Sequence, residues 1–361
     1  MNLKLLSLFT IALNFSFPSF ASNTIDKQVS GERLLFVHSY PSGHRRMLLN
    51  KGFKKAIKVR YPDSKIRFVN LDYGKLKHVF SPYNKNNLEK YSKEVSEERS
   101  RLHQHLADFK PTILVIADDE AGDVMHPLPS QFTGPIFLMG MNRPLSSISW
   151  YNKDPERYKG GIYDKKPVKE AFQLIQRVKP AKRVALITSD EMTSYSLIPY
   201  VKSQLAQTDA EIVEIVKSNK YSVWEKELPR LDKIADLVWI LIPYNILDDS
   251  GNKVKLRTIG NLVRSKVSGI TVGLSDISIK IGLLFAQASN SQFIGAQLGE
   301  LVVKYLKDDK RFPVGFEKRF YYQFLVNPNV AKEKDIHIPN DIMSVLNLSF
   351  DEEIIENMGT I

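Results

Sequence analysis

The chain has 361 residues, of which 43% are hydrophobic, contains no cysteine and carries a formal net charge of +11. The absence of cysteine excludes disulfides, thiolate metal sites and cysteine nucleophiles, so stability must come from buried apolar surface. Length alone favours two domains. Basic residues alternate with acidic ones without forming a block, which favours a solvated basic surface. The alternative is a surface that attracts anionic lipid headgroups, an acidic receptor or an anionic ligand.

The N-terminal residues have the pattern of a secretory signal peptide. Lys4 supplies a positive charge, residues 5–17 are apolar but short for a bilayer span, and Ser19 and Ala21 are the small residues that a signal peptidase reads. We predict cleavage after Ala21; the alternative is a membrane anchor. The removed segment contains one lysine and no acidic residue, so the mature charge is +10. No cysteine follows, so the sequence predicts a periplasmic protein without a lipid anchor.

Short apolar runs recur along the mature chain. Six of them are nearly continuous, as expected for strands buried on both faces of a parallel sheet. They are Leu34–Val37, Ile113–Ala117, Ile136–Met141, Val184–Thr188, Val238–Ile242 and Ile270–Leu274, and the more alternating run Ile66–Leu71 lies between the first two.

Helical patterns separate these runs. Apolar residues recur at helical spacing in Met47–Val59, Leu88–Phe109, Lys166–Val178 and Ser291–Lys307. Because residues 31–142 and 165–275 show the same strand–helix rhythm, we predict an α/β fold of two doubly wound parallel-sheet lobes.

Three segments interrupt the rhythm and predict a three-crossover hinge between the lobes. The first, Arg143–Gly161, contains two prolines, a run of serines and a Gly-Gly pair; the others are Ser275–Ser289 and Phe312–Gly315. The corresponding lobe boundaries are 31–142 plus 276–311 for lobe 1, and 143–275 plus 312–361 for lobe 2.

The C-terminal part resembles the end of the ABC-transporter substrate-binding family that includes tryptophan- and tyrosine-binding periplasmic proteins. The matching positions are Gly295, Gly299, Leu306-Lys307, Pro313, Val326-Asn327, Ala331-Lys332 and Ile338-Pro339. The family's glycine after the lysine-rich turn is absent near Asp335. The resemblance implies a type I periplasmic-binding fold whose lobes close on a small-molecule ligand. It also implies a membrane permease of an ABC importer as partner.

The opening segment, LLFVHSYPSGHRRMLLNKGFKKA, resembles periplasmic ligand-sensing modules. Such modules usually carry a tryptophan where this chain has His44-Arg45-Arg46, so the ligand can differ. This second resemblance implies an alternative partner, a membrane histidine kinase or a diguanylate cyclase or phosphodiesterase.

Candidate ligand-binding residues follow the predicted strands, because ligands of open α/β sheets bind at the carboxyl ends of the strands. In the first lobe they are His38, Ser39, Tyr40, Asp118, Asp119, Asn142 and Arg143, and in the second they are Thr188, Ser189, Tyr244, Ser275 and Asp276. Hydroxyl groups and free amides at helix starts suit a carboxylate, and tyrosine suits a ring. These types favour an amino-acid-like or aromatic ligand.

Each candidate has a structural alternative. Ser39 can cap the following helix, and Asp119 can be a helix N-cap rather than a ligand for an amine or a hard cation. Arg143 can clamp a ligand carboxylate or form a structural ion pair. Trp239 lies within an apolar run and is expected in the core.

No catalytic or phosphate-binding motif is present. The sequence lacks HExxH, G-x-S-x-G, a P-loop and a complete G-x-G-x-x-G pattern. We therefore expect a monomeric binding protein that is not an enzyme and uses no cofactor, metal or nucleic acid.

Overall fold

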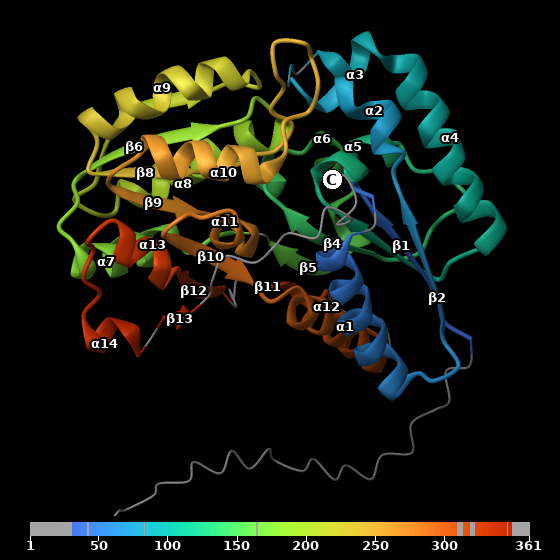
Figure 1. Ribbon diagram of the computed structural model, residues 1–361. Coiled ribbons are helices and arrows are strands. Elements are labelled where there is room, and N and C mark those ends of the chain that lie inside the picture. Colours follow the sequence, from blue (N-terminus) through green and yellow to red (C-terminus); the bar gives the residue numbers. More distant parts are fainter. Residues whose placement is uncertain are drawn as a thin grey trace, which may run out of the picture.

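The computed structural model describes residues 31–348 except 42, 83, 85, 164, 309–312, 318–321 and 345, so the predicted signal peptide lies outside it. Two mainly parallel sheets each form the centre of a lobe (Figure 1). This arrangement confirms the predicted two-lobed α/β class.

The first sheet has the strand order β11-β5-β4-β3-β1-β2 and is parallel throughout. Its strands are β1 (Arg33–His38), β2 (Lys65–Asn70), β3 (Ile113–Ala117), β4 (Ile136–Met141), β5 (Tyr158–Tyr163) and β11 (Gly315–Glu317). Its helices are α1 (His44–Arg60), α2 (Tyr73–Phe80), α3 (Asn87–Lys90), α4 (Ser92–Phe109), α5 (Asp119–Met125), α6 (Ser149–Lys153) and α12 (Ser291–Lys307), with 3₁₀ turns at Leu145–Ser147 and Pro155–Arg157.

Alternate residues of these strands enter two separate cores. Leu35 and Val37 pack toward α4 and α5, whereas Leu34 and Phe36 pack toward α1 and α12. Because helices cover both faces, the strands consist of continuous apolar runs, as the sequence indicates.

The second sheet has the order β13-β12-β10-β9-β8-β6-β7, with only the β10–β12 pair antiparallel among its named pairs. Its strands are β6 (Arg183–Thr188), β7 (Glu211–Lys217), β8 (Leu237–Ile240), β9 (Ile270–Gly273), β10 (Phe285–Ser289), β12 (Tyr322–Val326) and β13 (Asn347–Leu348). Its helices are α7 (Val168–Val178), α8 (Met192–Leu205), α9 (Tyr221–Ile234), α10 (Leu256–Lys266), α11 (Asp276–Lys280), α13 (Pro328–Glu333) and α14 (Asn340–Met343). Trp239 is fully buried in this lobe, as expected.

The chain crosses between the sheets one strand later than the sequence patterns predict, at each of the three crossovers. β5 lies in the predicted first crossover but pairs with β4, and β10 lies in the predicted second crossover but pairs with β9. β11 pairs with β5 before the chain reaches β12 in the other sheet. The structure therefore places residues 158–163 with the first sheet and 285–289 with the second, which differs from the predicted lobe boundaries. The sequence of β5 resembles a loop because it contains a Gly-Gly pair, and glycine is uncommon in the interior of a strand.

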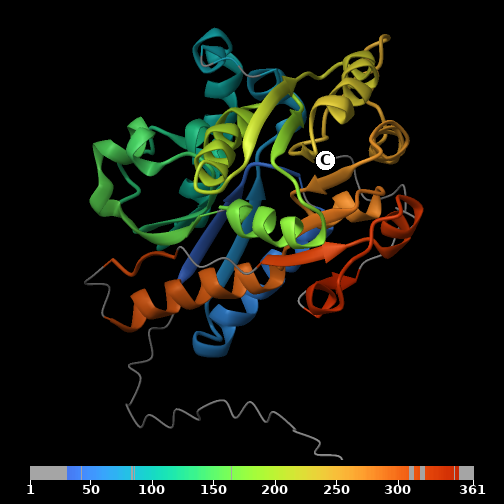
Figure 2. The ribbon, with the colours of Figure 1, turned by 90° about the vertical axis from the view of Figure 1, so that its left-hand side faces the viewer.

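Helices α1 and α12 pack side by side although about 240 residues separate them in the chain (Figures 1 and 2). Glycines make this close approach possible. A β-carbon added at Gly52 would lie 1.9 Å from the carbonyl oxygen of Gln292, and one at Gly295 would lie 2.0 Å from that of Leu49. The contact fixes α12, which follows β10 of the second sheet, against the first lobe.

We expect the variant Gly295→Ala to lower the free energy of unfolding by about 3 kcal/mol, because the two helices must separate to admit the methyl group. Urea unfolding followed by circular dichroism measures the change. Gly74→Ala on α2 is the matched control: the added carbon would lie 3.5 Å from Asp72 Oδ1, so the higher helix propensity of alanine should leave stability unchanged or raise it by up to about 1 kcal/mol. Equal losses in both variants would contradict the packing explanation.

Candidate functional site

The carboxyl ends of the two sheets meet through a hydrogen-bonded group of three side chains. The Tyr40 hydroxyl, just after β1, donates to Glu120 Oε1 at 2.8 Å and lies 3.3 Å from Thr193 Oγ1. Thr193 lies in the first turn of α8 in the second lobe, and its hydroxyl lies 3.5 Å from the same carboxyl oxygen. We call these three residues the interlobe triad. It occupies the place where open α/β sheets bind ligands.

A second polar contact joins the lobes beside the triad. Asn219 Nδ2 of the second lobe donates to Ser81 Oγ at 3.2 Å, and Ser81 Oγ lies 3.5 Å from the Asp190 carbonyl. Met192 extends from the second lobe into the core of the first. The structure therefore has its lobes in contact.

Glu120 is a buried carboxyl group with little electrostatic compensation. Only 3% of its surface is exposed, and burial raises its pKa to about 8, assisted by the nearby charges of Asp118 and Asp119. The hydrogen bond from Tyr40 opposes this rise in the pKa only in part. At neutral pH the carboxyl is therefore mainly protonated, and it can both donate and accept a hydrogen bond.

The second lobe presents a buried acid of its own. Glu191 Oε1 accepts hydrogen bonds from Ser189 Oγ at 2.7 Å and from Asn245 Nδ2 at 3.2 Å. Burial raises the pKa of Glu191. Burial also raises the pKa of Tyr73, and the negative charges of Glu191 and Glu120 add to this rise, so Tyr73 lies within electrostatic range of both acids. Facing acids and a phenol suit a ligand with a cationic or hydrogen-bond-donating group.

Asp118 has a strained backbone at the end of β3. Its φ is 68° and its ψ 162°, a region that residues other than glycine rarely occupy. Gly140, with φ 72°, leaves room for the carboxylate, because a β-carbon there would lie 2.7 Å from Asp118 Oδ1. Arg46 interacts electrostatically with Asp118, and its guanidinium lies 6.0 Å from the centre of the Tyr40 ring. Strain of this kind concentrates at functional sites, which supports the prediction for Asp118.

Two predicted residues of the first lobe, His38 and Ser39, have hydrogen-bond partners within that lobe. His38 is 1% exposed, stacks on Phe36 and lies 2.9 Å from Asn50 Oδ1 through Nε2; burial lowers its pKa to about 3. Ser39 Oγ donates to the Ala117 carbonyl and accepts from the amide of Ala121. The serine therefore joins the ends of β1 and β3 to the start of α5, and it does not cap the following helix α1, whose N-cap is Gly43.

The predicted charged anchors form an internal network. Asp119 Oδ2 accepts from the amides of Asn142 and Arg143, and Arg143 Nη2 binds Asp123 Oδ1 at 2.7 Å. Trp150 Nε1 donates to the same oxygen of Asp123 at 2.8 Å. Arg143 is only 21% exposed, so the structure favours the structural ion pair over a ligand clamp.

The predicted residues of the second lobe also contact partners within their own lobe. Thr188 Oγ1 lies 2.8 Å from Ser194 Oγ, which secures the start of α8. The Tyr244 hydroxyl lies 3.5 Å from Ser275 Oγ, and burial raises the pKa of Tyr244. Asp276 forms a 4.0 Å ion pair with Lys280 within α11. Ser189 alone of this set bonds directly to Glu191, as described above.

The predicted site residues do not include two members of the triad, Thr193 and Glu120, although Asp118 and Asp119 next to Glu120 are among them. Tyr73 and Glu191 near the triad are also not among them. Glu191 and Thr193 lie at the start of α8, shortly after Thr188 and Ser189. The rule that ligands bind at the carboxyl ends of strands predicts them too when it includes the first turn of the next helix. Tyr73 begins α2, beyond the end of β2, and could have been found in the same way.

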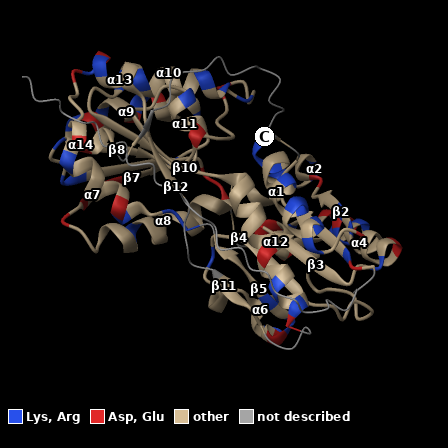
Figure 3. Ribbon diagram, turned by 90° about the horizontal axis from the view of Figure 1, so that it is seen from below, with Lys and Arg blue, Asp and Glu red and all other residues tan. Residues whose placement is uncertain are grey.

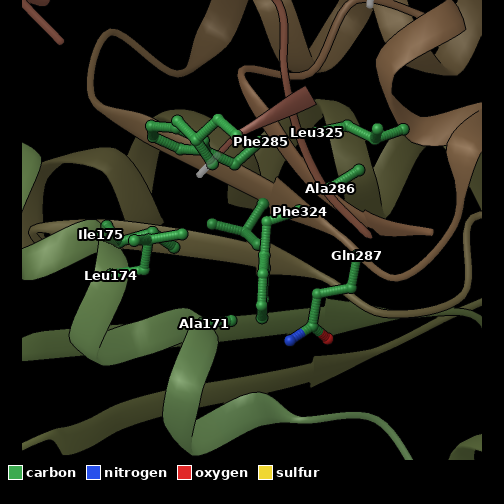
Figure 4. A pocket seen from close by; sticks show the side chains of 10 residues that line it. Ala171, Leu174, Ile175, Phe285, Ala286, Gln287, Phe324 and Leu325 are labelled. Atoms are coloured by element: carbon green, nitrogen blue, oxygen red, sulfur yellow. The ribbon is translucent and has the colours of Figure 1, made fainter. Parts of the chain in front are cut away.

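An apolar recess between α7 and the second sheet is too small to be the site (Figure 4). Its volume is about 10 Å³, enough for roughly one water molecule. In the part of the chain that the structure describes, no three His, Asp or Glu side chains are placed to hold a metal ion. None of the helices in these residues is both long and apolar enough to cross a membrane.

Comparison with known proteins identifies the class to which this architecture belongs. Residues 129–347 match the family described as ABC transporter substrate binding protein. The match covers more than half of the chain, and the chain therefore belongs to this family of substrate-binding proteins. No curated protein matches it.

Solved structures share the fold at low sequence identity. A conserved domain protein from Vibrio cholerae is 14% identical, with a TM-score of 0.62 over 88% of this chain and 99% of that one. An ABC domain from Streptococcus pneumonia in complex with L-Trp is 17% identical, with a TM-score of 0.61 over 88% and 99%. A substrate-binding protein with adhesive properties from Clostridium difficile, in a ligand-free open form, is 13% identical, with a TM-score of 0.60 over 89% and 100%.

Proposed function

We propose that the protein is exported to the periplasm, captures a small organic molecule between its lobes and delivers it unaltered to the permease of an ABC importer. The observation that carries the proposal is the interlobe triad, Tyr40, Glu120 and Thr193, at the strand ends of a substrate-binding protein. In such a fold, hinge closure around the ligand brings the two strand ends together.

The polar groups at this contact favour an amino-acid-like or aromatic ligand. Tyr40 and Tyr73 offer aromatic faces, their ring centres being 5.0 Å apart. Glu120, Glu191 and Asp118 offer acceptors for an amine. The L-Trp complex of the Streptococcus neighbour adds support for this class of ligand.

A thermal-shift screen of the chain from residue 22 tests the proposal. The probes are the natural amino acids, aromatic acids and amines, polyamines and nucleosides. A true ligand at 100 times its dissociation constant should raise the free energy of unfolding by about 2.7 kcal/mol. Tyr40→Phe should weaken that ligand about fivefold, because one hydrogen bond is worth about 1 kcal/mol.

Tyr221→Phe on α9 is the matched control and should bind as the wild type does. Mass spectrometry of the recovered ligand separates binding from turnover. A chemically altered ligand would overturn the binding-protein proposal, and so would a screen in which no probe stabilises the chain.

A sensory role is the second candidate, because of the opening segment from Leu34 to Ala56. The structure places Tyr40 of this segment at the interlobe contact. Ligand-dependent stimulation of a reconstituted permease ATPase supports import. Ligand-dependent change in the activity of a membrane kinase or cyclic-di-GMP enzyme supports sensing.

A further inference from the structure

One side of α1 carries a continuous row of basic residues with an apolar residue at each end. The members recur at spacings of three and four, which places them on one side of a helix. We call this row the α1 stripe; it consists of Met47, Lys51, Lys54, Lys55, Lys58 and Val59. The other side of α1, including Phe53 and Ile57, is buried against α12 and the first sheet. The stripe therefore faces outward over about 18 Å, at 1.5 Å per residue.

The charge of the stripe is not compensated within its helix. α1 contains no acidic residue, and Figure 3 shows basic but no acidic positions along it. Among the described residues, Lys51, Lys54 and Lys55 are exposed and take part in no ion pair. Lys58 contacts only the backbone carbonyls of Pro62 and Ser64. The stripe thus presents three exposed lysines whose charge no acidic side chain of the described residues offsets in an ion pair.

The neighbouring helix α12 carries both acidic and basic residues, so it does not neutralise the positive charge of the α1 stripe. The exposed charged residues of α12 at its C-terminal end are Glu300, Lys304 and Lys307. By contrast, the charged helix α4 pairs Arg101 with Glu98. The excess of positive charge is therefore a property of the α1 side of the first lobe.

Two exposed apolar side chains distinguish the stripe from an ordinary solvated face. Met47 is 58% exposed and Val59 68% exposed, and they belong to the few large hydrophobic residues found at the surface. A basic helix face with exposed apolar side chains is typical of binding to an anionic bilayer surface, where lysines meet phosphates and apolar groups enter the headgroup region. An acidic protein surface would match the lysines but leave the two apolar ends unexplained.

We propose that the α1 stripe docks the mature protein reversibly on an anionic phospholipid surface. This interaction is independent of the interlobe triad. It would hold the binding protein close to its membrane partners.

Co-sedimentation of the chain from residue 22 with lipid vesicles tests this proposal. We expect binding to phosphatidylglycerol–phosphatidylcholine vesicles at about 0.1 M salt and release at about 1 M, as the Debye length falls from about 10 Å to about 3 Å. Pure phosphatidylcholine vesicles should bind little. The variant K51Q/K54Q/K55Q should lose about 100-fold in partition coefficient, because each cation near an anionic surface contributes a factor of about five.

The matched control is K179Q/K202Q/K226Q, which removes three exposed lysines from the second lobe. Its net charge is therefore equal to that of K51Q/K54Q/K55Q. It should bind as the wild type does, and both variants should keep the wild-type melting temperature because glutamine and lysine have similar helix propensities. Absence of binding to the anionic vesicles at low salt would overturn the proposal and point to an acidic protein partner. An equal loss in both triple variants would also overturn it, because net charge alone would then explain the attraction.

Discussion

Replacing Arg143 by alanine is expected to lower the free energy of unfolding of the first lobe, apart from any effect on ligand binding. The guanidinium lies 2.7 Å from Asp123 Oδ1 and 3.4 Å from Asp119 Oδ1, and these carboxylates are only 7% and 3% exposed. Without the arginine, two acids remain buried without a cation. Breaking a buried ion pair from one side costs about 3–5 kcal/mol. Urea unfolding of Arg143→Ala should show a loss of that size.

A matched arginine on the surface provides the control. Arg177 pairs with Asp341, and both side chains are more than 60% exposed. Because exposed ion pairs contribute about 0–1 kcal/mol, Arg177→Ala should change stability little. If Arg143→Ala also left stability unchanged but lowered ligand affinity, Arg143 would be a ligand anchor and the structural interpretation would fail.

The two-lobed fold was predictable because its strands are buried on both faces. Ile113–Ala117 is apolar at every position and Val184–Thr188 at every position but the last, and each belongs to a strand that is paired on both sides within its sheet. The predicted crossovers lie one strand before those in the structure, because the strands next to them lack this signature. β5 contains Lys159 and two glycines, and β10 contains the buried polar residue Gln287.

The sequence predicts the region in which the candidate binding residues lie, but not which of their side chains reach the interlobe contact. Strand ends are found from apolar runs, and two residues predicted in this way, Tyr40 and Asp118, lie at or near the interlobe contact. Whether a polar side chain points to its own lobe or to the other depends on partners that are distant in sequence. His38 is the last residue of β1 and lies on the same face of the strand as Phe36, so its ring stacks on Phe36, whereas Tyr40 lies two residues further on, beyond the end of the strand. The polar partners of Arg143 likewise come from α5, about twenty residues earlier.

Glu120 is expected to make the protein less stable as pH rises from about 5 to about 8. Its pKa is about 8 in the folded chain and near the ordinary value of 4.5 when unfolded. Between these values the folded state holds a proton that the unfolded state has lost, so stability falls with rising pH and levels off above about 8. At about 1.4 kcal/mol per pH unit, the full effect is of the order of 5 kcal/mol.

The variant Glu120→Gln isolates this contribution, because glutamine keeps an acceptor for Tyr40 but does not titrate. Its stability relative to the wild type should increase steadily from pH 5 to pH 8 in urea unfolding at each pH. Glu170→Gln, at an exposed position on α7, should run parallel to the wild type. An equal pH dependence in the wild type and Glu120→Gln would show that the carboxyl is already ionised in the folded chain.

Because Thr193 of the second lobe contacts this carboxyl, ionisation also places an unpaired charge at the interlobe contact. A cationic ligand would neutralise that charge, so the affinity for such a ligand should rise over the same pH range in the wild type and stay constant in Glu120→Gln.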